Sequence, residues 1–207
     1  MQIHDDVLRL RRLVDDLGTL AEADAALAGP NIAVERCDLA EIAAGAADAL
    51  RPLAEANQQQ VNRQLETAII HGDPTRRAQI VTNLLTNAIK FAPAAGTIDL
   101  AVRQDPAQRQ ATLTVSDNGP GIPIDDRQHV FERFYRSDST RPVASSGIGL
   151  AVVAQLVQAH GGTVELVDST VGTTVTVTFP TSSLLAPFSS LQISRWCGNA
   201  DFGSRSD

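Results

Sequence analysis

Three polar side chains share one face of a predicted helix and could together hold a metal ion and a polyphosphate. Asn83, Asn87 and Lys90 lie in the run NLLTNAIKF, and their spacing of four and three residues places them on one helical face. Amide oxygens suit Mg²⁺, which keeps most of its waters and takes one or two protein oxygens. A lysine cation suits phosphate. An ordinary solvated helix face would look the same, so this pattern needs support from other segments.

A second segment, SDNGPGIP at residues 116–123, places a carboxylate at the end of a predicted strand. Asp117 there can accept a hydrogen bond from an exocyclic amine such as that of adenine. Gly119 and Gly121 allow backbone and ligand to approach closely, and Ile122 can pack on a flat ring. A simple tight turn would have the same composition.

A third segment, SSGIGLAV at residues 145–152, places Gly147 and Gly149 at the start of a predicted helix. The free N–H groups and the positive dipole end of a helix N-terminus form a good phosphate site. A Gly-x-Gly pair alone is weak evidence, but here it follows the two segments above.

The ordered set of an asparagine helix, Asp-x-Gly-x-Gly and Gly-x-Gly-Leu resembles the nucleotide-binding motifs of the GHKL ATPase superfamily. Within it, the sequence is similar to the catalytic domain of sensor histidine kinases over about residues 1–180. The run VFERFYR at residues 130–136 resembles the aromatic F box of these kinases. Lys90-Phe91 and the closing Gly161-Gly162 and Gly172-Thr173 strengthen the resemblance.

The resemblance implies a role for each matching residue. Asn87 would hold Mg²⁺ with support from Asn83, Lys90 would reach the phosphates, and Asp117 would bind the adenine amine. It also assigns to the ATP site Phe91, Gly119, Gly121, Ile122, Gly147, Gly149, Leu150 and Thr173.

Two arginines of the F box complete the implied catalytic set. Arg133 or Arg136 would offset charge that develops on the transferred phosphoryl group. Ala144-Ser145 depart from the family pattern, in which further glycines are common, and this departure should stiffen the hinge of the lid. Asn83 stands where ATP-hydrolysing relatives have a glutamate, and an amide cannot act as a general base. We therefore expect transfer of the γ-phosphoryl group rather than hydrolysis.

The elements that position these motifs can be read from periodicity. We expect one long amphipathic helix over residues 1–27, because apolar residues there alternate four and three apart. Further helices are predicted at 38–56, 74–92 and 147–159. Strands are predicted within 61–70 and at 97–103, 111–116, 163–167 and 173–179. The predicted fold is an α/β two-layer sandwich of a mixed sheet and three helices, of the GHKL ATPase/histidine kinase type.

The same patterns divide the chain into four parts. We expect a partial dimerisation helix at residues 1–28, a linker at 29–37, an ATP-binding catalytic domain at 38–180 and a disordered tail at 181–207.

The histidine that such kinases phosphorylate has no clear counterpart here. His4 is the one candidate, but no Arg-Thr-Pro follows it, and the resemblance implies that residues 1–28 match the second helix of the acceptor hairpin. We therefore predict transfer in trans to a histidine-bearing partner protein, with a response regulator as the next acceptor and a homodimer as a further possibility. Alternatives are a serine kinase of the anti-sigma-factor type and a nucleotide-dependent regulatory module without transfer activity.

Composition limits the function classes. The 207 residues carry a formal net charge of −7, which argues against binding nucleic acid, since that needs clustered cations. No apolar run reaches the roughly 20 residues of a membrane span. Cys37 and Cys197 lie far apart, without metal-type spacing. We expect a cytoplasmic protein, with membrane association through its partner as a further possibility.

Overall fold

The computed structural model describes residues 35–135, 147–169 and 171–181. The predicted helix over residues 1–27, His4, Arg136, the hinge residues Ala144 and Ser145 and the tail beyond Thr181 lie outside these ranges.

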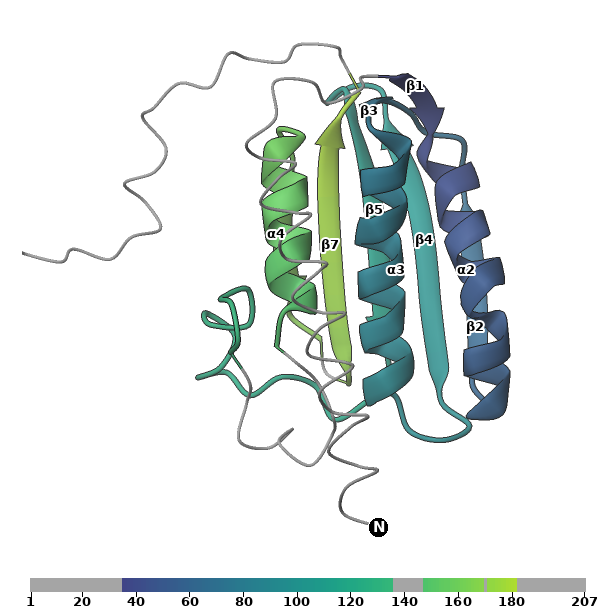
Figure 1. The fold of residues 1–207 in the computed structure, drawn as a ribbon, viewed down its shortest axis with the longest axis vertical. Helices are drawn as coiled ribbons and strands as arrows, with labels where there is room; N and C mark the ends of the chain where they lie inside the picture. The colour runs from purple at the N-terminus through teal and green to yellow at the C-terminus, as the bar shows by residue number, and fades with distance from the viewer. Residues whose placement is uncertain (1–34, 136–146, 170, 182–207) are drawn as a thin grey trace, which may run out of the picture.

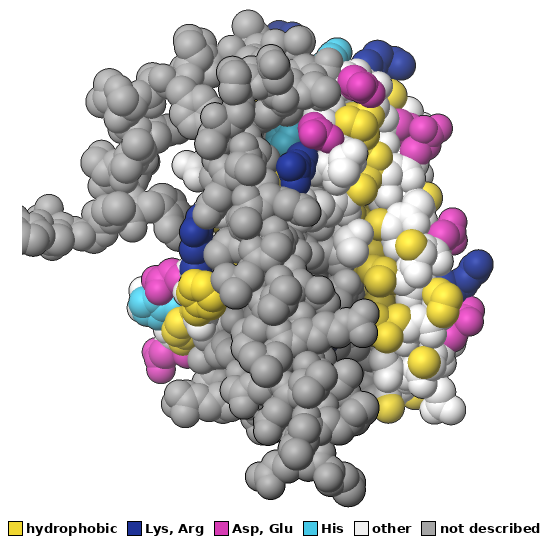
Figure 2. Space-filling view, in the orientation of Figure 1, with side chains coloured by type: hydrophobic (Ala, Val, Ile, Leu, Met, Phe, Trp, Pro, Cys, Tyr) yellow, Lys and Arg dark blue, Asp and Glu magenta, His cyan; other side chains and the backbone are white. Residues whose placement is uncertain are grey.

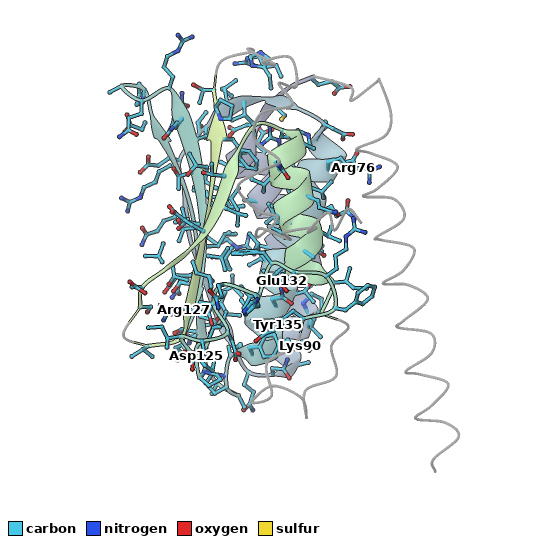
Figure 3. All side chains as sticks on the ribbon, turned by 90° about the vertical axis from the view of Figure 1, so that its left-hand side faces the viewer. Arg76, Lys90, Asp125, Arg127, Glu132 and Tyr135 are labelled. Carbon is cyan, nitrogen blue, oxygen red and sulfur yellow. The ribbon has the colours of Figure 1, made fainter. Side chains whose placement is uncertain are left out.

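The described chain forms two layers, with the helices side by side on one face of the main sheet (Figures 1 and 3). The described helices are α2 (Leu39–Ala56), α3 (Pro74–Phe91) and α4 (Gly149–Ala159). The strands are β1 (Glu35–Asp38), β2 (Gln60–Leu65), β3 (Ile69–Gly72), β4 (Thr97–Asp105), β5 (Gln110–Asp117), β6 (Thr163–Val167) and β7 (Thr173–Pro180).

The main sheet has five strands in the order β2-β4-β5-β7-β6. β2 runs parallel to β4 and the other neighbours are antiparallel, so the sheet is mixed. The two faces of the sheet differ, because successive side chains of a strand point to opposite faces. In β5, Leu113 and Val115 are buried, whereas Thr114 and Ser116 pair across the other face with Thr176 and Thr174 of β7 at 3.3 and 2.7 Å.

Helix α3 lies between α2 and α4 and carries the asparagine motif (Figure 1). Its start is fixed by Asp73, whose carboxylate accepts from the N–H groups of Thr75 and Arg76 at 2.8 and 3.2 Å, and by Pro74 in the first turn. Its apolar face packs into the core through Ile80, Val81, Leu84, Leu85, Ala88 and Ile89. Burial of such side chains stabilises by about 1.5–3 kcal/mol each, so packing holds this helix in register with the sheet.

The predicted fold class is confirmed, with three departures in detail. Strand β1 covers residues 35–37 of the predicted linker together with Asp38, and it pairs antiparallel with β3. The predicted 61–70 strand region supplies two strands that belong to different sheets. Helix α4 begins at Gly149 and not at Gly147, because Gly147 has a φ of 73° and a left-handed residue cannot be part of an α-helix.

None of the helices in the described ranges is both long and apolar enough to cross a membrane.

Candidate functional site

The three motifs meet at one end of the molecule, where α3 ends, β5 ends and α4 begins (Figure 1). Lys90, Asp125, Arg127 and Tyr135 lie at this end, whereas Arg76, near the start of α3, lies toward the other (Figure 3). The glycine contacts described below join the three elements directly.

Asp117 is a buried carboxylate at the last position of β5. It is only 9% exposed and lies opposite Thr173 in the β5–β7 register. Burial raises its pKa above the ordinary value, and backbone hydrogen bonds from Gly119 and Thr173 act in the opposite direction. The Gly119 N–H donates to Oδ1 at 2.8 Å. Asp117 is therefore a buried acceptor that backbone hydrogen bonds from Gly119 and Thr173 hold in place.

Glycines around Asp117 let three backbone segments pack without side chains between them. A Cβ on Gly119 would lie 2.6 Å from the carbonyl oxygen of Phe91 at the end of α3. A Cβ on Gly172 would lie 1.7 Å from the carbonyl oxygen of Asp117, and one on Gly121 would lie 2.9 Å from that of Gly172. Gly121 and Gly172 also have φ of 76° and 74°, a conformation that glycine adopts readily.

Asn87 faces the start of α4. A Cβ on Gly149 would lie 3.4 Å from Nδ2 of Asn87, so the amide and the first turn of α4 are in contact range. Within the described ranges no side chain caps the start of α4, and the dipole at a helix N-terminus suits an anion. The Nδ2 of Asn83, one turn earlier, is buried without a hydrogen-bond partner in the described part of the chain. The predicted phosphate residues Asn83, Asn87 and Gly149 are thus brought together, with Leu150 next in α4.

The end of α3 is held from another part of the chain. The buried amide of Gln59, between α2 and β2, donates through Nε2 to the carbonyl oxygens of Ile89, Ala92 and Pro93 at 3.0, 3.1 and 3.2 Å. These bonds satisfy carbonyls that a helix end leaves unpaired. Lys90 Nζ lies 5.6 Å from the ring centroid of Phe91, so the predicted phosphate-binding cation is on a fixed helix end.

The F-box segment is docked on α4. The Phe134 N–H donates to the Gly147 carbonyl at 3.1 Å. The amide oxygen of Gln155, in the orientation that a donor-only guanidinium requires, accepts from Nη2 and Nε of Arg133. Phe134 has a φ of 64° and is 58% exposed. Figure 2 shows hydrophobic and charged side chains side by side where this loop reaches the surface.

The Arg133 guanidinium contacts α4 at Gln155. Gln155 is six residues beyond Gly149, which is about 9 Å along the helix axis at 1.5 Å per residue. The contact therefore lies between one and two turns beyond the start of α4.

The donor set fits a magnesium–nucleotide complex better than a metal bound by protein alone. The described residues contain no group of three or more His, Cys, Asp or Glu side chains that could cage a metal ion. The polar groups near the start of α4 are amides, as expected for an ion that keeps waters and binds phosphate oxygens. The buried Nδ2 of Asn83, which has no hydrogen-bond partner among the described residues, leaves one polar group for a ligand.

Sequence reasoning missed three residues that shape this end of the molecule. Gln59 and Gln155 each make their contacts through one side-chain amide. The Nε of Arg127 donates to the carbonyl oxygen of Ile122 at 3.2 Å. Each lies outside the recognised motifs and carries no spacing signal. Only the tertiary contact identifies them.

Comparison with known proteins agrees with this geometry. The family described as "Histidine kinase-, DNA gyrase B-, and HSP90-like ATPase" matches residues 72–183, which include all three motifs. The chain belongs to this family. Its ATP-binding fold is of the GHKL type.

Named relatives of the chain are histidine kinases. It is 37% identical over 164 residues to the signal transduction histidine-protein kinase/phosphatase MprB of Mycobacterium ulcerans, a match covering 79% of this chain and 30% of that protein. With MprB of Mycobacterium avium it is 46% identical over 104 residues, which is 50% of this chain and 20% of that one. The chain thus spans about a third or less of these relatives.

Solved structures share the fold. A mycobacterial sensor histidine kinase MprB structure matches with a TM-score of 0.63 and 31% identity, over 71% of this chain and 97% of that one. Full-length ShkA in complex with AMPPNP matches with a TM-score of 0.68 and 26% identity, over 91% of this chain and 41% of that one.

Proposed function

We propose that this chain is the ATP-binding catalytic component of a two-component sensor histidine kinase. The proposal rests on two groups of residues at one end of the molecule. Buried Asp117 would bind the adenine amine, and Asn87, beside the start of α4, would lie at the phosphates. The family match and the relatives named as histidine kinases support it. The ShkA structure, determined with AMPPNP, supports a nucleotide at this fold.

Mg²⁺ would be held by Asn87, with Asn83 beside it, and would neutralise charge on the phosphates. Asn83 offers an amide where a water-activating carboxylate would be needed for hydrolysis. The chain therefore binds and orients ATP, and the γ-phosphoryl group passes to an acceptor side chain.

The acceptor we propose is a histidine on a separate partner protein, which then phosphorylates a response regulator. The motif of an acceptor box is not found around His4, and the other histidines of the chain lie in the catalytic domain. His160 is buried, and His129 pairs with Glu132 at 2.7 Å in the F-box segment.

The test is to mix the purified chain, Mg²⁺ and γ-labelled ATP with a candidate partner that bears an acceptor hairpin. We expect acid-labile label on the partner and none when its acceptor histidine is replaced. Asn87→Ala should abolish transfer, whereas Asn62→Ala, on exposed β2, should not. Label only on this chain at His4 would refute transfer in trans. Acid-stable label would favour the serine kinase, and ATP binding without any label would favour a regulatory module.

A further inference from the structure

Arg127 connects the two loops that flank Asp117. Its Nε donates to the Ile122 carbonyl oxygen at 3.2 Å, and its Nη1 forms an ion pair with Asp168. We call residues 118–122 the base-pocket loop, and Asp168, Ser169, Val171 and Gly172 the rear loop between β6 and β7. A planar guanidinium holds both bonds in a fixed geometry, so one side chain sets the distance between the loops.

Movement of either loop would move the base pocket. The rear loop contacts Asp117 directly, because a Cβ on Gly172 would lie 1.7 Å from the Asp117 carbonyl oxygen. It contacts the base-pocket loop at Gly121, whose Cβ position is 2.9 Å from the Gly172 carbonyl oxygen. The two loops therefore form the wall behind the buried carboxylate.

Core packing does not hold the segment that follows the base-pocket loop. Ile124 is 80% exposed, and the backbone there continues through turns, with the Asp126 N–H donating to Pro123 at 3.0 Å. The polar bonds of Arg127 replace the missing apolar anchor. Arg127 (Figure 3) is itself 30% exposed and Asp168 is 95% exposed.

We infer that Arg127 is a positioning residue for the adenine end of the nucleotide site, acting through Ile122 and Asp168. The inference rests on the proposed function, because it needs an adenine nucleotide as ligand. An exposed ion pair contributes little to global stability. Loss of Arg127 should therefore change ligand affinity and leave the fold intact.

The experiment measures dissociation constants of ATP, ADP and adenosine for the full chain and its variants by calorimetric titration. Arg127→Ala should weaken all three by a similar factor, about three- to tenfold for one lost hydrogen bond with its ion pair. Asp168→Asn, at an almost fully exposed position, should weaken them less. Lys90→Ala should weaken ATP and spare adenosine, because it acts on the phosphates.

Arg103→Ala, on the exposed face of β4, is the matched control and should change none of the three constants. If wild type binds no adenine nucleotide, the proposed function fails first. If wild type binds and Arg127→Ala binds equally well, or loses affinity only for ATP, the positioning role is overturned. A large fall in Tm of Arg127→Ala would also overturn it, since the role would then be structural.

Discussion

At the scale of single residues, the site separates two kinds of polar group. Asp117 is a buried carboxylate whose Oδ1 accepts from the Gly119 N–H, and Asn83 and Asn87 supply neutral amides nearer α4. The carboxylate suits a neutral amine donor, and the amides suit a hydrated cation with phosphate. Replacing the carboxylate and replacing an amide should therefore reduce different parts of ligand binding.

Asp117→Asn should reduce ATP affinity about ten- to a hundredfold, because a charged acceptor is replaced by an amide whose NH₂ faces another donor. The Asn oxygen can still accept from the Gly119 N–H, so folding should be retained. Titration with ATP tests this, with Asp99→Asn on exposed β4 as the control. Unchanged affinity would remove Asp117 from the base site.

His160 provides a pH test far from the site. Its Nδ1–H donates to the Leu156 carbonyl at 2.7 Å and its Nε2 accepts from the Asp73 N–H at 3.4 Å, so the neutral ring joins α4 to the start of α3. Burial, reinforced by the Arg77 cation, lowers the pKa of His160 below its ordinary 6.5. The unfolded chain then binds the proton more tightly, and the stabilisation is present above about pH 6.5 and lost as pH falls.

We therefore expect the free energy of unfolding in urea to fall between pH 7.5 and 5.5 more steeply for wild type than for His160→Gln. The slope for one group cannot exceed about 1.4 kcal/mol per pH unit. Asn62→Ala, at an exposed position of β2, replaces no titratable group and should keep the wild-type slope. Equal slopes for all three proteins would show that His160 does not contribute.

Motif residues could be predicted from sequence because each motif has its own spacing, and the structure joins Asp117, Gly119 and Gly149 to the end of α3. Their roles in ATP binding stay predictions. Arg77 could not be predicted to be buried. It lies on the apolar face of α3 with 1% exposure and stacks 3.7 Å from the Phe179 ring centroid. Periodicity marks the position as inward, but a cation there is explained only by the Phe179 ring and by the His71 carbonyl oxygen, which accepts from Arg77 Nη2 at 3.1 Å.

At the scale of elements, caps and breakers set helix ends and can be read from sequence. The predicted ranges 74–92 and 38–56 agree with the starts of α3, where Asp73 is the N-cap, and of α2, where the Asp38 carboxylate accepts from the Ala40 N–H at 2.9 Å. The four residues of β1 show no alternation of apolar and polar side chains, and β1 pairs with a strand more than 30 residues away in the sequence, so it could not be predicted from local pattern. The parallel β2–β4 pair could not be predicted for the same reason.

Gly172→Ala should disturb the β5–β7 junction, because its Cβ would overlap the Asp117 carbonyl and the backbone φ is 74°. We expect a loss of about 2 kcal/mol or more in the free energy of unfolding, with weaker ATP binding. The control is Gly45→Ala in α2, where nothing lies within 4 Å of the added Cβ. That change should stabilise by about 0.5–1 kcal/mol, and urea titration measures both.

At the scale of the whole molecule, the proposed nucleotide site lies at one end of α3, and the Arg77–Phe179 and Asp73–His160 contacts lie at the other. Helix α3 spans the distance as one rigid element with a packed face. A ligand that binds only the folded chain should therefore stabilise the whole domain and not one loop.

Saturating Mg²⁺ and ATP, at about 100 times the dissociation constant, should add about 2.7 kcal/mol, which is a rise in Tm of about 5–10 °C for a domain of this size. Chelation of Mg²⁺ should reduce the shift, and Asn87→Ala should make it independent of Mg²⁺. Thermal unfolding with and without EDTA measures this. A shift of equal size in EDTA would exclude a role for the ion in binding.

The amide of Gln59 has a consequence for how this domain can vary. Its Nε2 donates to three carbonyl oxygens at the end of α3. A residue remote in sequence from every motif therefore holds this helix end in place. In a saturation mutagenesis screen for kinase output, position 59 should therefore tolerate as few replacements as a ligand-contacting position. Sequence change in the α2–β2 turn would therefore be limited by the need to hold the end of α3.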